Sequence, residues 1–190
     1  MPIILKGATS GQVTLDTPAI AGTNNLELPA ATGTIQLLKL ETAQATTSGT
    51  FKDFLNIPSW AKKITVMFNS VSTNGTSNYL IQLGAGSIET TSYNSGWTYS
   101  STGGTTTTGF NFHANVVAAN VHSGIMTLGL IGSNLWVSSS IACATNTGIA
   151  NMIQAGSKTL SGTLDRLRLT TVNGTDTFDA GSVNILIEGN

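Results

Sequence analysis

The stretch Lys62-Lys63-Ile64-Thr65-Val66-Met67-Phe68-Asn69-Ser70-Val71 decides the fold class, because its core residues alternate with a period of two. Alternation of this kind is typical of a half-buried β-strand. The turn Ser72-Thr73-Asn74-Gly75-Thr76 follows, and Asn-Gly is the strongest short hairpin signal since both residues tolerate positive φ. Tyr79-Leu80-Ile81-Gln82-Leu83 is therefore predicted to be the return strand of a hairpin.

Short strand patterns separated by Gly-rich turns recur along the rest of the chain, whereas amphipathic helix patterns are poor. Further strands are predicted over 109–113, 124–131, 134–142, 164–172 and 182–188. One short helix is predicted around Ile149–Ala155. This pattern predicts an all-β protein, an antiparallel β-sandwich or jelly roll, and places Val183, Ile185 and Ile187 in its core.

The composition is dominated by uncharged polar residues. Thr, Ser, Asn and Gly supply 86 of the 190 residues, and only 17 are charged, with a net charge of −1. No basic surface is therefore expected for nucleic acid or an anionic membrane. Between Lys63 and Lys158 the only charged residue is Glu89. Such a stretch leaves a surface short of solubilising charge, so we expect copies of the chain to cover one another in a homotrimer.

Residues 1–40 differ from the rest of the chain. They contain a quasi-repeat, Pro18–Thr23 and Pro29–Thr34, and each copy follows a strand of about four residues. Strands this short cannot bury a core of their own. The sequence therefore predicts an extended N-terminal arm over 1–40 and a β-sandwich domain over 41–190. We find neither a secretory signal nor a membrane-spanning run, so the protein is expected to stay in the cytoplasm where it is made, or to leave by a route that needs no signal.

Catalytic motifs are missing from the sequence, which predicts that the protein is not an enzyme and needs no cofactor. His113, His122 and Cys143 could form a nucleophilic group in space, but surface or hydrogen-bonded interior histidines are the favoured interpretation. Cys143 is the only cysteine, so no disulfide can form within the chain, and a small buried apolar role is expected for it.

Two further pairs of charged residues could have structural or functional roles. Asp176 and Asp179 share an oxygen-rich loop that could hold Ca²⁺, but it departs from the EF-hand spacing, and a turn capped by Asx hydrogen bonds is favoured; no metal site is predicted. Arg166 and Arg168 lie two apart and face the same side. We expect them to pair with acidic residues such as Glu188 or to protect an edge strand.

Three aromatic residues form the candidate ligand-binding site. Tyr93, Trp97 and Tyr99 lie at even offsets, so on an extended strand they project to one side, next to a predicted surface loop over 100–105. Aromatic faces among Asn and Ser residues have the chemistry to hold a neutral sugar. The alternative is that these side chains pack in the sandwich core or at a subunit interface.

Three segments resemble virion proteins of tailed bacteriophages. Residues 7–35 resemble a segment near the N-termini of phage fibre and decoration proteins. Residues 57–66 and 164–181 resemble the two ends of a phage structural domain. The resemblance implies a trimeric β-sandwich displayed on a virion, with the arm contacting other virion proteins such as capsid or baseplate proteins.

Two functions are consistent with this sequence. The first is a trimeric fibre-like or receptor-binding protein that recognises a glycan on the host surface. The alternative is a capsid decoration, or cement, protein that stabilises the phage head. A depolymerase acting on the glycan is less favoured, because no pair of carboxylates stands out.

Overall fold

The computed structural model describes residues 3–6, 10–15, 36–113, 116–147 and 151–190. The chain divides into two compact units, Met1–Thr34 and Ile35–Asn190. Its described residues form strands, turns and loops, and they include no helix that could cross a bilayer. The strands are β1 (Ile3–Lys6), β2 (Gln12–Leu15), β3 (Leu37–Leu40), β4 (Gln44–Ala45), β5 (Lys52–Leu55), β6 (Ala61–Thr73), β7 (Tyr79–Ala85), β8 (Ser87–Ile88), β9 (Asn94–Tyr99), β10 (Thr102–Thr106), β11 (Phe110–His113), β12 (His122–Gly132), β13 (Leu135–Ala144), β14 (Asn151–Thr159), β15 (Arg166–Thr171) and β16 (Phe178–Gly189).

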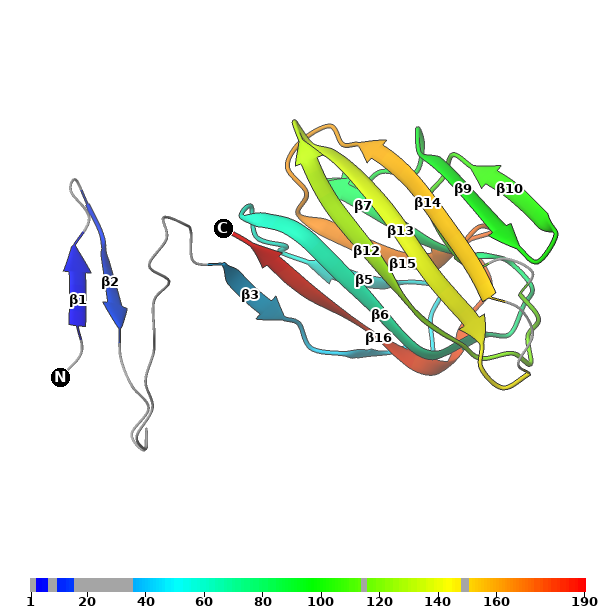
Figure 1. The fold of residues 1–190 in the computed structure, drawn as a ribbon. Helices are drawn as coiled ribbons and strands as arrows, with labels where there is room; N and C mark the ends of the chain where they lie inside the picture. Colours follow the sequence, from blue (N-terminus) through cyan, green and yellow to red (C-terminus); the bar gives the residue numbers. More distant parts are fainter. Residues whose placement is uncertain (1–2, 7–9, 16–35, 114–115, 148–150) are drawn as a thin grey trace. The chain divides into compact units, whose positions relative to one another are not determined.

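The second unit is a sandwich of two antiparallel sheets (Figure 1). The larger, nine-stranded sheet has the order β10-β9-β14-β13-β12-β6-β16-β3, with β4 beside β16. The smaller, five-stranded sheet has the order β11-β7-β15-β5, with β8 beside β7. This confirms the all-β antiparallel sandwich expected from the sequence, while the jelly-roll topology stays a prediction.

The hydrophobic core lies between the two sheets and is built largely from alternate residues of the longer strands. Ile64 and Val66 of β6 are fully buried, as are Leu167 and Leu169 of β15 in the opposite sheet. The expectation for the last strand is confirmed: its alternating aliphatic side chains are at most 1% exposed. They are Val183, Ile185 and Ile187.

The hairpin predicted at Asn74-Gly75 is wrong, although both of its strands exist. β6 belongs to the larger sheet and β7 to the smaller one, so the segment crosses between the sheets. The backbone N–H and side-chain Oδ1 of Asn74 both bond the backbone of Thr177, at 3.0 and 2.9 Å. These bonds hold the crossing in place. A two-residue turn with positive φ occurs instead at Ser133 (46°) and Asn134 (63°), between β12 and β13.

Two local predictions in the middle of the chain are also wrong. Most of the short helix expected at Ile149–Ala155 lies in β14, whose described residues begin at Asn151. There Met152 and Gln154 are buried while their neighbours are exposed, and partner strands on both sides satisfy the backbone. Most of the surface loop expected over 100–105 is the edge strand β10, paired with β9.

The N-terminal residues begin with a separate strand pair, in which β1 and β2 run antiparallel. The expected arm extended to residue 40, but its last strand, β3, pairs with β16 in the larger sheet of the sandwich. The division between the two units falls after Thr34. Both copies of the quasi-repeat lie within 16–35, outside the described residues.

Candidate functional site

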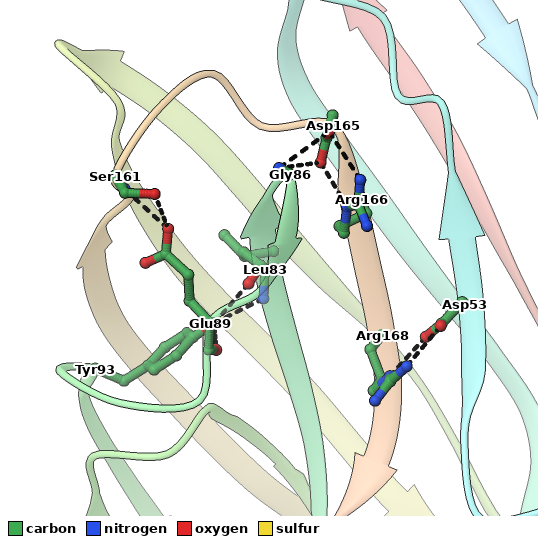
Figure 2. Close-up of polar contacts among 9 residues, drawn as sticks. All are labelled: Asp53, Leu83, Gly86, Glu89, Tyr93, Ser161, Asp165, Arg166 and Arg168. Carbon is green, nitrogen blue, oxygen red and sulfur yellow. Dashed lines mark hydrogen bonds and ion pairs between the residues drawn. The ribbon is translucent and has the colours of Figure 1, made fainter.

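Tyr93, the first of the three candidate aromatic residues, is a core residue with 2% of its surface exposed. Its hydroxyl accepts a hydrogen bond from the backbone N–H of Leu83 at 2.7 Å, and it lies 3.0 Å from the Glu89 carbonyl oxygen (Figure 2). The ring packs edge-on against Phe110. Burial raises the pKa of the Tyr93 phenol far above its usual range. Tyr93 therefore offers no exposed face to a ligand.

Trp97 and Tyr99 are half-buried and lie on β9, on the same side as the buried Ser95. That side faces the smaller sheet. With the Asn111 amide oriented so that its oxygen faces the indole, Trp97 Nε1 donates to it at 3.0 Å. Tyr99 meets the ring of His113 edge-on, with centroids 6.2 Å apart. The even spacing places these two side chains on one side, as expected, and their contacts are those of packing.

The two histidines form a buried pair. His113 and His122 are 1% and 0% exposed, with ring centroids 4.0 Å apart, and Tyr79 packs edge-on against His122. Burial lowers the pKa of His122, and its interaction with the Val71 backbone only partly opposes this. Both histidines therefore lie in the interior, one of the two places that the favoured interpretation allowed, while the hydrogen bonds expected of an interior histidine stay a prediction.

Cys143 does not join the histidine pair. It is half-buried on β13, where it neighbours the inward-facing Ala142 and Ala144 and so projects to the other side of the sheet. The fully buried role expected for it is wrong. The nucleophilic arrangement of these three residues is not assembled in this structure.

The loop after β15 is a turn closed by Asx hydrogen bonds, as favoured. Asn173 Oδ1 accepts from the backbone N–H groups of Thr175 and Asp176, at 3.0 and 3.2 Å. The Asp176 carboxylate accepts from the backbone N–H of Ser77 and from the Asn173 side chain. Asp179 lies apart from this network, exposed on β16. Among the described residues, no group of His, Cys, Asp and Glu is arranged to hold a metal.

The two arginines of β15 pair with aspartates and not with Glu188 (Figure 2). Arg168 makes two bonds of 2.7 Å to Asp53 on β5, and Arg166 bonds its neighbour Asp165. Glu188 pairs with Lys63 instead. The expected pairing with acidic residues is therefore confirmed, although the partner named, Glu188, is wrong. The edge-strand alternative is wrong, because β15 lies between β7 and β5.

The surface that stands out is the outer side of the larger sheet across β12, β13, β14, β9 and β10, here called the uncharged face. An exposed isoleucine from each of three neighbouring strands forms a row across it. Ile125 opposes Ile141, which in turn opposes Ile153, and their exposed fractions are 49%, 56% and 55%. Half-buried Met67 of β6 continues the row beside Ile125.

Charge is missing from this face. β9, β10, β12 and β13 contain no Asp, Glu, Lys or Arg. Lys158, in β14, points inward and is 5% exposed; its ammonium pairs with Glu89 at 2.7 Å. Most of this face comes from the charge-poor stretch of the sequence, which also supplies β7 and β11 of the smaller sheet. Water solvates the face poorly where the isoleucines lie.

The uncharged face is large enough for a protein interface. With strands about 4.8 Å apart and a rise of about 3.3 Å per residue, its five strands cover roughly 650 Å². Standard interfaces take roughly 600–1,000 Å² from each partner, so this face is at the lower end of that range. The lack of charge was predicted from the sequence, but the row of isoleucines was not. Its signal in the sequence is an isoleucine at an outward-facing position in each of three strands.

Compared with known family models, curated proteins and solved structures, the chain matches none of them.

Proposed function

We propose that the protein is a non-enzymatic structural component of a bacteriophage virion that associates as a homotrimer through its uncharged face. Residues 1–40 are proposed to attach it to other virion proteins. The observation that carries this proposal is the row of Ile125, Ile141 and Ile153 on a face without charge. The virion part of the proposal rests on the sequence resemblance.

Physical chemistry favours a second copy of the chain as the partner of this face. Full burial of an isoleucine contributes about 1.5–3 kcal/mol, so covering a half-exposed one contributes about 1 kcal/mol. An uncharged surface needs no partner of opposite sign, and no charge loses its hydration when two such faces meet. Each copy of the chain carries one such face, and in the proposed trimer each face meets the faces of both neighbours around the three-fold axis.

Two placements on the particle are proposed. In the first, the trimer is a fibre-like or receptor-binding component that recognises a host glycan. In the second, it is a decoration protein on the capsid, which is favoured by the separate N-terminal unit that could dock on a lattice. Immunogold imaging of virions with an antibody against the sandwich domain distinguishes head from tail. Absence of label on virions would refute both placements.

The assembly is tested by light scattering. The wild-type protein should have about three times the 19.6 kDa chain mass. Ile141→Lys places a charge in the middle of the row, at a side chain 56% exposed in the single chain, and should give monomers that melt cooperatively. Leu55→Lys is the matched control, because Leu55 is 52% exposed on the smaller sheet and its variant should remain trimeric. A monomeric wild-type protein at micromolar concentration would refute the assembly.

A further inference from the structure

A hollow lies on the outer side of the smaller sheet, opposite the core. Its floor is formed by Leu80 and Gln82 of β7, which alternate with the core residues Tyr79, Ile81 and Leu83. Leu80 is 1% exposed and Gln82 is 7% exposed, although neither belongs to the core cluster. Residues of neighbouring segments therefore cover much of Leu80 and Gln82 and form the sides of the hollow. The hollow has a volume of about 390 Å³, within the range of roughly 300–1,000 Å³ usual for small-molecule sites.

One side of the hollow is formed by the ring of Phe51, which packs against the ion pair of Arg168 and Asp53. Phe51 is 47% exposed, and the Arg168 guanidinium lies over its ring, 4.0 Å from the centroid. Arg168 is itself held by two bonds of 2.7 Å to the Asp53 carboxylate, as Figure 2 shows. Of the described residues that line the hollow, Arg168 alone is charged, and Asp53 neutralises it. The hollow therefore favours neither an anion nor a cation.

The remaining lining is rich in hydroxyl and amide groups that the fold holds in place. Gln82 Nε2 donates to the Thr108 carbonyl oxygen at 2.9 Å, which fixes the orientation of the side-chain amide. Thr170 Oγ1 donates to the Thr50 carbonyl oxygen at 3.0 Å. Thr90 and Asn173 complete the polar part of the wall. Hydroxyl groups both donate and accept, so such a lining matches a ligand whose own groups do both.

We propose that this hollow binds a neutral carbohydrate, with the apolar face of a sugar ring on Phe51 and its hydroxyls toward Gln82 and the threonines. An exposed ring beside fixed hydrogen-bonding groups gives both apolar contact and orientation. The site differs from the predicted one, since Tyr93 is buried and Trp97 packs toward Asn111. The role of this sugar as the receptor of a virion rests on the proposed function. The binding of the sugar to the purified protein does not.

The test is saturation-transfer NMR and calorimetry on the purified full-length protein. The probes are the methyl glycosides of glucose, galactose, mannose and rhamnose together with N-acetylglucosamine, at millimolar concentration. Glucose 6-sulfate and glucosamine serve as charged analogues. At least one neutral sugar should receive saturation. Phe51→Ala should weaken its binding at least tenfold, and Phe51→Trp should restore it. Leu55→Ala is the control, because Leu55 lies on β5 four residues after Phe51, is also exposed and does not line the hollow; this variant should bind as the wild type does.

Three results would overturn the proposal: no saturation of any neutral sugar, unchanged binding by the Phe51→Ala variant, or tighter binding of a charged analogue. Light scattering on the same samples separates this proposal from the assembly. A trimer that binds no sugar leaves the structural role intact and removes the hollow as a site. A monomer whose sugar binding depends on Phe51 supports the hollow and refutes the proposed assembly.

Discussion

Removing the Tyr93 hydroxyl by Tyr93→Phe should destabilise the sandwich while leaving its shape unchanged. The ring that packs edge-on against Phe110 is retained. The lost oxygen is the acceptor for the backbone N–H of Leu83, at 2.7 Å, in a residue with 0% exposure. The hydroxyl hydrogen also loses its bond to the Glu89 carbonyl oxygen, at 3.0 Å.

The size of the effect follows from what remains after the substitution. A buried N–H left without an acceptor costs about 1–3 kcal/mol, and the Glu89 carbonyl can turn to water at little cost. We therefore expect a loss of about 2 kcal/mol from a total stability of about 5–15 kcal/mol. For a domain of this size, that corresponds to a fall in Tm of roughly 4–8 °C.

Urea unfolding and calorimetry measure this loss, with Tyr99→Phe as the control because Tyr99 is only half-buried. The control should change stability by less than about 0.5 kcal/mol. Equal stability of the Tyr93→Phe variant and the wild type would refute the reasoning. If that variant also lost binding to host cells, Tyr93 would belong to a ligand site instead of the core.

Four further outcomes are expected. Burial lowers the pKa of His122, so the unfolded chain takes up a proton that the folded chain rejects. Stability should therefore fall as pH drops below about 6.5, with a smaller slope in His122→Gln; equal slopes in urea titrations would contradict this. Glu89→Gln removes the charged partner of the buried Lys158 ammonium, which keeps its hydrogen bond to the Thr91 carbonyl oxygen, and should cost about 2 kcal/mol. Adding Lys158→Met should recover most of this loss in urea unfolding. Ending the chain at Gly181 removes most of β16 with its three buried aliphatic side chains and should give insoluble protein, so a soluble, cooperatively melting product would show that this part of β16 is peripheral. Removing residues 1–40 should leave a cooperatively melting sandwich but abolish its incorporation into virions, and normal loading onto arm-deficient virions would show that attachment lies elsewhere.

The sequence was sufficient to predict strands with a clear two-residue alternation, such as β6, because this pattern depends only on one face being buried. It failed for β14, expected to be largely helical, and for β10, expected to be a loop. It was not sufficient to predict which sheet each strand joins. Asn74-Gly75 has the residues of a hairpin turn, yet the segment crosses between the sheets. There Asn74 bonds Thr177, and Asp176 bonds Ser77, about 100 residues apart in the chain. Contacts so distant in the chain leave no local signal.

The candidate site shows the same limit. Even spacing correctly placed Trp97 and Tyr99 on one side of a strand, but spacing alone does not tell whether that side faces solvent or a second sheet. The hollow was missed because its parts are dispersed: Phe51 precedes β5, Gln82 lies on β7, and Arg168 lies on β15. The pairing of Arg168 with Asp53 depends on the register of β15 against β5.

The position of β16 also governs how the domain must fold. It pairs along its length with β6, and Ile64 opposes Ile187 across 123 intervening chain positions. Closing so long a loop costs entropy before any contact repays it, and topologies dominated by such pairings fold on timescales of roughly milliseconds to seconds. Until β16 arrives, β6 has an open edge, so slow closure of this one strand pair sets the interval during which chains are exposed to misassociation.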